Sequence, residues 1–237
     1  MGDGGVLPTW RGKGIGTAIL AWQEQRLHDI AAAQQQNGAA ACLVGNKRNS
    51  VGVQPLYSRA GYRKTNHRHI MTRDLAQNIP DLPLPDGFEI RPVTPEHMAM
   101  IWNTAQTGFD EPLWFEAYMP MAAAVSAPID PTLWHVAWHV DSGQVAGGVF
   151  SIVFPQGVAS GCAGCEAWSD EVVVRSPWRR RGLGKALLAY HLRAMRARGL
   201  TEASLAVNDD NPYLAPKLYA DLGYHVIASW LEYRKAI

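Results

Sequence analysis

The chain has 237 residues and a formal net charge of +1, with 47% hydrophobic and 18% charged residues, so it can bury a core but has no overall basic field that would attract nucleic acid or an anionic membrane. No apolar run approaches the ~20 residues of a membrane-spanning helix, the N-terminus does not read as a signal peptide, and three cysteines do not make a disulfide framework. We therefore expect a cytoplasmic protein with no nucleic-acid partner and no membrane partner.

The N-terminal third is predicted to begin with a glycine-bearing turn and to continue with alternating helices and strands. In chain order these are a helix over 15–34, a buried strand over 39–44, a helix over 51–60, and two strands or one long bent strand over 62–74. The segment IPDLPLPDG that follows contains three prolines, which is typical of a linker. We therefore divide the chain into a first unit over 1–78, a linker over 79–86 and a second unit over 87–237.

The second unit predicts a longer series of elements. They are a strand over 87–93, helices over 94–108 and 111–124, a hairpin formed by 133–140 and 144–153, a strand over 166–175, a helix over 183–197, a strand over 202–207, a helix over 212–222 and strands near 224–236. Thr94 is the expected N-cap of the first of these helices, with Pro95 at its first position.

One sequence pattern occurs twice in the chain. VLPTWRGKGIGTAIL at 6–20 corresponds to VRSPWRRRGLGKALL at 174–188. A second block, LYSRAGY at 56–62, corresponds to LYADLGY at 218–224, at a constant offset of 162 residues. Two ordered blocks with matching spacing indicate a duplicated module.

The first block of each copy predicts an anion-binding turn. A valine strand at 172–174 runs into a basic bend, in which Gly182 and Gly184 let the backbone pass close to a ligand without a Cβ in the way. The helix that follows directs free N–H groups and the positive end of its dipole at the bend. Four cations add to this field, so we expect a ligand that carries phosphate, such as a pyrophosphate; they are Arg179, Arg180, Arg181 and Lys185.

Two better-known glycine motifs do not fit this turn. A Walker loop needs four residues between its glycines and then Lys-Ser/Thr, and a dinucleotide fingerprint needs three glycines in GxGxxG spacing. Gly12, Gly14 and Gly16 of the first copy do not have that spacing, and the second copy has Arg180 at the position of Gly12.

The turn instead resembles the signature of the GNAT superfamily of acyl-CoA-dependent N-acyltransferases, Arg/Gln-x-x-Gly-x-Gly/Ala after a strand. The segments 179–184 and 11–16 both fit it. Family members often continue with an Asn after the next strand and a helix ending Leu-Tyr-x-x-x-Gly-Phe/Tyr, and both copies contain this block as well. The chain is identified as a member of this superfamily, of the tandem-domain type with an incomplete N-terminal copy.

The resemblance implies an α/β (α+β) fold with a mixed, mostly antiparallel central sheet and flanking helices, complete over 87–237 and partial over 1–78. It also implies that acetyl-CoA is the acyl-donor cosubstrate and that no metal is required. The implied CoA-binding residues lie on the strand before the turn, in the turn and after the next strand: Val172, Val173, Val174, Arg179, Arg180, Arg181, Gly182, Leu183, Gly184, Lys185 and Asn208.

The implied reaction is attack of a primary amine on the thioester through a tetrahedral intermediate. Tyr219 stands where the family often has a tyrosine that protonates the departing thiolate, and its alternative role is a core residue. Glu171 is the candidate general base, and its alternative is a solvated strand end with water as the base. Simple strand alternation puts Glu171 and Ser169 on one face and Asp170 and Trp168 on the other.

Two other functions compete with acyl transfer. The chain can be a non-catalytic acyl-CoA-binding or regulatory module, in which case Tyr219 has no effect on any reaction. Nucleic-acid binding through Arg179–Arg181 would show steeply salt-dependent affinity, and the near-zero net charge disfavours it. The amine acceptor, a small molecule or a peptide, is not specified by the sequence.

The first unit begins five residues before its own strand end, so the earlier strands of the module are missing. The sequence leaves two alternatives, a truncated form of a longer tandem protein or a genuine half domain. A half domain would expose a sheet edge, and we expect either the second unit or a second subunit of a homodimer to cover it.

Cysteine and histidine pairs complete the candidate features. Cys162-Ala163-Gly164-Cys165 is a lone CxxC and is interpreted as a loop between two strands. The pairs His67/His69 and His135/His139 each lie on one face of a predicted strand. Because the sequence places no further ligand beside them, we interpret them as lining half-buried surfaces and expect no metal site.

Overall fold

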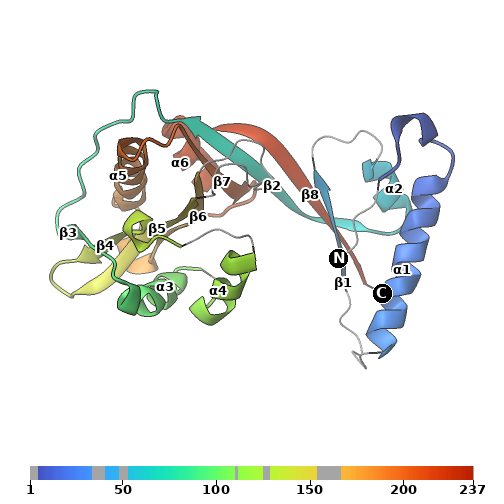
Figure 1. Cartoon of the computed structure of the whole chain (residues 1–237), viewed down its shortest axis with the longest axis horizontal. Helices are drawn as coiled ribbons and strands as arrows, with labels where there is room; N and C mark the ends of the chain where they lie inside the picture. Colours follow the sequence, from blue (N-terminus) through green and yellow to red (C-terminus); the bar gives the residue numbers. More distant parts are fainter. Residues whose placement is uncertain are drawn as a thin grey trace. The chain divides into compact units, whose positions relative to one another are not determined.

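The structure, a computed structural model, describes residues 5–33, 41–47, 53–109, 112–124, 129–153 and 167–236. The chain forms two compact units, and each unit is built from segments that are not consecutive in the sequence. Unit 1 comprises Met1–His69, Val207–Pro212 and Val226–Ile237, and unit 2 comprises Ile70–Ala206 and Tyr213–His225. Figure 1 labels the elements of both. Among the described residues, no helix combines the length and the apolar character needed to cross a membrane.

Unit 2 is built on a sheet in which the strand order is β2-β7-β6-β5-β4-β3. The strands are β3 (Phe88–Arg91), β4 (His135–His139), β5 (Gln144–Val153), β6 (Ala167–Val174), β7 (Glu202–Asn208) and the end of β2 (Arg63–Asp74). The pairs β3–β4, β4–β5 and β5–β6 are antiparallel, whereas β6–β7 is parallel. The predicted fold class, a mixed and mostly antiparallel sheet flanked by helices, is confirmed.

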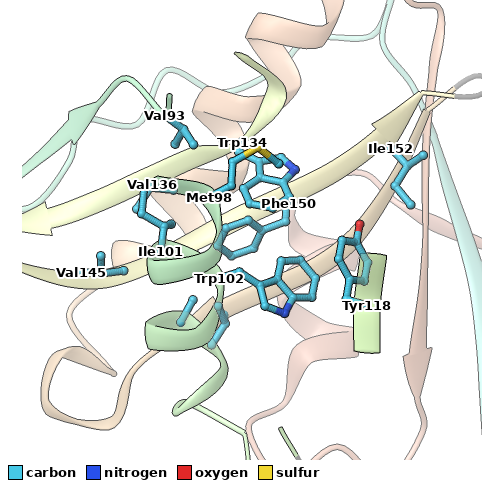
Figure 2. Packing of buried hydrophobic residues seen from close by; sticks show 12 residues of the cluster. Val93, Met98, Ile101, Trp102, Tyr118, Trp134, Val136, Val145, Phe150 and Ile152 are labelled. Atoms are coloured by element: carbon cyan, nitrogen blue, oxygen red, sulfur yellow. The ribbon is translucent and has the colours of Figure 1, made fainter. Parts of the chain in front are cut away.

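Helices cover both faces of this sheet. Helices α3 (Met98–Gln106) and α4 (Phe115–Ala124) lie on one side, and α5 (Leu183–Ala197) and α6 (Ala215–Asp221) lie on the other (Figure 1). Trp102 of α3 is fully buried and stacks on Tyr118 of α4 at a ring-centroid distance of 3.9 Å. Trp134, directly before β4, and Phe150 on β5 pack against the Trp102 ring, and these aromatic side chains form the centre of the core on that side (Figure 2).

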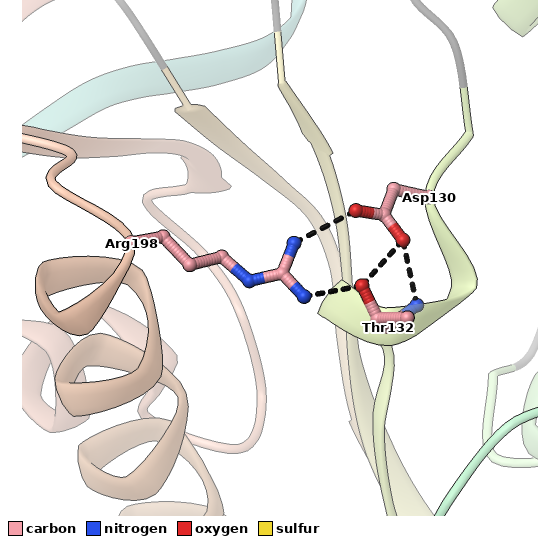
Figure 3. Close-up of polar contacts among 3 residues, drawn as sticks. All are labelled: Asp130, Thr132 and Arg198. Atoms are coloured by element: carbon pink, nitrogen blue, oxygen red, sulfur yellow. Dashed lines mark hydrogen bonds and ion pairs between the residues drawn. The ribbon is translucent and has the colours of Figure 1, made fainter.

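The C-terminal end of α5 is tied to the residues that lead into β4. Arg198 donates to the Asp130 carboxylate at 2.7 Å and also to the Thr132 hydroxyl (Figure 3). Asp130 in turn accepts from the Thr132 backbone amide at 2.9 Å and caps the 3-10 turn Pro131–Leu133. Because this turn occupies the start of the predicted 133–140 strand, β4 begins only at His135.

Local chemistry explains two further differences from the predicted elements. The predicted helix over 94–108 is a 3-10 turn, Pro95–His97, followed by α3, with Thr94 as the N-cap residue of the turn. The predicted helix over 212–222 begins at Ala215 because Leu214 adopts a left-handed conformation with φ 57°. The helix over 183–197 has the predicted bounds.

Unit 1 contains the first copy of the repeated sequence pattern. Its elements are the 3-10 turn Pro8–Trp10, α1 (Ile15–Ala33), β1 (Ala41–Lys47), α2 (Val53–Arg59), the start of β2 and most of β8 (His225–Ala236). β1 pairs antiparallel with β8 over its whole length. Leu20, Tyr62 and Tyr233 form the small buried cluster of this unit. The region 62–74, predicted as two strands or one long one, is the single strand β2.

Candidate active site

Strands β6 and β7 are neighbours at one end only. Their parallel ladder contains two residue pairs, the second of which is Trp168↔Ser204, whereas β6 stays paired with β5 up to Val174↔Gly147. Within the described residues of these two strands, pairing between them stops at Trp168, and the later part of β6 has one open edge. This edge includes 172–174, the segment whose backbone was predicted to bind the acyl donor.

A β-bulge lies just before this open segment. Ser169 pairs with Ser151 and Glu171 pairs with Phe150, so Asp170 is an extra residue on β6. Because Phe150 and Ser151 are consecutive, their side chains point to opposite faces, and so do those of Glu171 and Ser169. The expectation that Glu171 and Ser169 share a face is therefore wrong, because the bulge resets the alternation of the strand.

The turn after β6 is shaped by residues in the left-handed region. Arg180 has φ 63° and Gly182 has φ 83°, and α5 begins directly afterwards at Leu183. The Ala186 amide donates to the Gly182 carbonyl at 3.1 Å, so the amides of 183–185 precede the first helical hydrogen bond. Turn amides at the positive end of a helix form a concave site that favours an anion.

The predicted cofactor-binding Arg179 fixes the path of this turn. Its Nε donates to the Val174 carbonyl at 2.8 Å, and a terminal nitrogen donates to the Gly108 carbonyl. The guanidinium carbon also lies 4.1 Å from the centroid of the Tyr213 ring, which the sequence reading did not single out. The guanidinium of Arg179 therefore holds the start of the turn against the end of β6.

The other predicted turn residues divide between surface and core. Arg180 and Arg181 are exposed, and half-exposed Lys185 lies 3.6 Å from the Asp221 carboxylate of α6. The Leu183 side chain is buried in the core of unit 2. A Cβ on Gly184 would lie 3.4 Å from the Val174 side chain, so a glycine at this position lets the helix approach the strand closely.

The predicted acid and base interact electrostatically. Tyr219 on α6 is 6% exposed, and burial raises its pKa above the ordinary value for a phenol. The charge of half-buried Glu171 on β6 raises this pKa further. Tyr219 is therefore a protonated hydroxyl at neutral pH, as a proton donor must be.

Asn208 belongs to the other compact unit. It is exposed at the end of β7, and its Oδ1 accepts from Asn66 Nδ2 at 3.2 Å within unit 1. The structure thus groups Tyr219, Glu171, the end of β6 and the glycine turn in unit 2 and groups Asn208 with unit 1. The CxxC segment at 162–165 lies outside the described residues.

Unit 2 also contains a buried polar chain that the sequence reading missed. His135 Nδ1 lies 2.7 Å from His191 Nδ1, and His191 Nε2 lies 2.8 Å from the Ser151 hydroxyl. Burial lowers the pKa of His135 to about 4 and that of His191 well below the ordinary value. Both rings are therefore neutral at pH 7. The interpretation of His135 as a half-buried surface residue is wrong, because α5 covers it.

The first glycine turn has the same backbone design. Arg11 Nε donates to the carbonyl of Val6, five residues earlier, at 3.2 Å, as Arg179 does to Val174. Gly14 has φ 79°, and the Ala18 amide donates to its carbonyl at 3.0 Å. Gly12 has φ 76° at the position that corresponds to left-handed Arg180.

Comparison with known proteins agrees with this geometry. The sequence model of the acetyltransferase (GNAT) family matches residues 98–224, which is more than half of the chain. The chain belongs to this family. No curated protein matches it closely enough to be counted as a relative.

Solved structures extend the likeness beyond the matched segment. A GCN5-related N-acetyltransferase from Sphaerobacter thermophilus is 29% identical, with a TM-score of 0.77, over 98% of this chain and 70% of that one. A tandem GNAT protein from the clavulanic acid biosynthesis pathway is 17% identical, with a TM-score of 0.62, over 98% of this chain and 72% of that one. A GCN5-related N-acetyltransferase from Kribbella flavida is 16% identical, with a TM-score of 0.58, over 92% of this chain and 76% of that one. The last two show a shared fold.

Proposed function

We propose that this protein is an N-acetyltransferase that transfers the acetyl group of acetyl-CoA to a primary amine, with its working site in unit 2. The observation that carries the proposal is the open edge of β6 ending in a glycine turn, with Tyr219 and Glu171 in electrostatic interaction beside it. An open strand edge offers hydrogen bonds to an amide-rich arm, and the turn offers amides and cations to a pyrophosphate. These two features suit the two halves of a CoA molecule.

In the proposed reaction the residues of unit 2 have separate roles. Glu171 takes a proton from the ammonium or from the attacking amine, so that the nitrogen lone pair can form the bond to the thioester carbonyl carbon. A backbone N–H on the edge of β6 at 172–174 donates to the developing oxyanion. When the C–S bond breaks, Tyr219 gives its proton to the thiolate. Because the pKa of Tyr219 is raised, this transfer depends on position rather than on acidity.

The remaining predicted residues bind the donor in this proposal. The amides at the start of α5, with Arg180, Arg181 and Lys185, hold the pyrophosphate, while Arg179 positions the turn through its bonds to two carbonyls. Gly182 and Gly184 keep the approach free of side chains. We further propose that residues 1–78 are a partial second copy of the module and that 87–237 is the complete copy. We also propose that the protein acts in the cytoplasm and that a homodimer is one way to cover the sheet edge of the partial copy.

The test measures release of free CoA from acetyl-CoA with a panel of primary amines, for the wild-type chain and Tyr219→Phe. We expect Tyr219→Phe to lower kcat by about 10²–10⁴-fold, the range of general acid–base catalysis, with acetyl-CoA affinity unchanged. The matched control is Tyr57→Phe, which changes the equivalent tyrosine of the first copy and should leave kcat unchanged.

Three results would contradict parts of this proposal. Unchanged turnover in Tyr219→Phe would remove Tyr219 from the acid role. Stoichiometric acetyl-CoA binding without transfer to any amine would identify the alternative, a non-catalytic acyl-CoA-binding module. Absence of acetyl-CoA binding in calorimetry would overturn the whole assignment.

A further inference from the structure

Two histidines and a carboxylate converge in unit 1, and none of the three has a role in the proposed reaction. His67 and His69 are alternate residues of β2, so their side chains share one face of the strand. Asp209, 142 residues beyond His67, follows the end of β7. The potential ligand atoms of these three residues all lie within 4.8 Å of one another.

The distances within this group match the spacing of ligands around a single ion. His67 Nδ1 lies 3.1 Å from Asp209 Oδ2, and His69 Nε2 lies 3.3 Å from Asp209 Oδ1. In a tetrahedral site with metal–ligand bonds of ~2.0–2.1 Å, neighbouring ligand atoms are ~3.3 Å apart. An ion can therefore enter with small shifts of side chains that already converge.

The surroundings hold these ligands in place. The Asp209 backbone amide donates to the His67 carbonyl at 2.8 Å, which fixes Asp209 against β2. The Ser229 hydroxyl lies 2.8 Å from His69 Nδ1, on the side of the ring opposite Nε2. A partner on the second ring nitrogen sets the orientation and tautomer of a metal-binding histidine. Ser229 thus has the position of such an outer partner.

Exposure and charge also suit an ion. The side chains of His67 and His69 are 27% and 17% exposed, so each ring is partly shielded, while Asp209 at 57% leaves a path to solvent. Asp209 supplies a carboxylate that faces both rings. Two imidazoles and one carboxylate suit divalent transition metals such as Zn²⁺ rather than Ca²⁺ or Mg²⁺.

We propose that His67, His69 and Asp209 form a divalent transition-metal site of the zinc class, with solvent completing the coordination and Ser229 positioning His69. The competing description is a metal-free network in which the two rings only hydrogen-bond to the carboxylate. The sequence predicts the two histidines but no third ligand, because Asp209 follows β7 and lies 142 residues beyond His67 in the chain. This site is independent of the proposed acyl transfer.

The first experiment titrates the metal-free full-length chain with Zn²⁺ in a calorimeter and with Co²⁺ in an absorption spectrometer. We expect one ion per chain. Co²⁺ should give visible bands without the near-ultraviolet charge-transfer band of a thiolate, so that binding by the cysteines at 162 and 165 is distinguished. A thermal melt with saturating Zn²⁺ should show a raised Tm, since the ion binds the folded form.

Variants assign the ligands. Asp209→Asn and His69→Gln should each lower Zn²⁺ affinity at least tenfold, and Ser229→Ala should lower it about 10-fold or more as an outer partner. The matched controls are Asp210→Asn, the adjacent exposed carboxylate, and His28→Gln, an exposed histidine of α1; both should bind as the wild type does. Circular dichroism checks that each variant is folded.

Two kinds of outcome would overturn the site. One is the absence of stoichiometric Zn²⁺ binding by the folded wild-type chain, which would leave the metal-free network as the description. The other is wild-type affinity in both Asp209→Asn and His69→Gln, or a thiolate band with Co²⁺, either of which would locate the ion elsewhere.

Discussion

The two glycine turns have nearly the same backbone and very different surroundings. In both, an arginine Nε bonds the carbonyl five residues earlier and a left-handed glycine precedes the helix. Trp10 before the first turn is 54% exposed, whereas Trp178 before the second is 7% exposed. The local sequence therefore determines the shape of the turn, and the rest of each unit determines how much of it is buried and braced.

The largest difference should appear when the two tryptophans are removed. Trp178→Ala removes a buried indole and should lower the free energy of unfolding by about 3–5 kcal/mol. Trp10→Ala changes an exposed side chain and should stay within about 0.5 kcal/mol. Urea unfolding with hydrogen exchange over 183–197 and 15–33 measures both, and equal losses would show that the surroundings of the two turns do not differ in energy.

Acid should weaken unit 2 through its buried histidines. The pKa of His135 is about 4 in the folded chain and ~6.5 when unfolded, so below pH 6.5 the unfolded chain binds a proton that the folded chain does not. Stability should therefore fall as pH drops from 6.5 to 4, by about 3 kcal/mol from His135, with His191 acting in the same direction.

A variant checks the source of this pH dependence. His135→Gln keeps a hydrogen-bonding side chain and removes one titrating group, so its unfolding should take up about one proton fewer over this range. The pKa of the Asp130 carboxyl is also lowered, by its hydrogen bonds to Thr132 and Arg198, so acid weakens the fold through Asp130 in the same direction, but at a lower pH than through His135. A proton uptake identical to that of the wild type would exclude His135 as the cause.

The third test compares the stability cost of an alanine at the equivalent glycine of each turn, and we expect the two costs to be equal. Gly182→Ala and Gly14→Ala should each cost about 1 kcal/mol, because each forces an alanine into the left-handed region while its Cβ has open space. Gly5→Ala, whose Cβ also has open space but whose φ is not positive, is the matched control and should be near neutral. A much larger cost at Gly182 alone would mean that the two backbones differ in strain.

The bracing arginines give a further comparison between the two turns. Arg179→Lys keeps the charge but loses the planar guanidinium that bonds two carbonyls and stacks on Tyr213, so we expect a loss of about 1–2 kcal/mol. Arg11→Lys loses one hydrogen bond at an exposed site, so its loss of stability should be only a few tenths of the loss in Arg179→Lys. Thermal melts give both values, and a reversed order would contradict the bracing role.

Much of unit 2 could be predicted because its signals are local. The spacing of apolar residues specifies α5, and glycines specify the turn before it. Element starts were predicted less well where one residue changes the backbone, as at Pro131 before β4 and at Leu214 before α6. The β-bulge at Asp170 was not predictable, because it exists only in the register between β5 and β6.

The sequence by itself determined the family, the repeated blocks, the glycine turns and the position of Tyr219 on the late helix. Each of these depends on residues that are close together in the chain. Tertiary structure alone decided that Glu171 acts on the pKa of Tyr219, that His135 meets His191, and that Asp209 meets His67 and His69. These contacts join strands and helices that are far apart in the chain, and their distances follow from strand register and helix packing rather than from any local pattern.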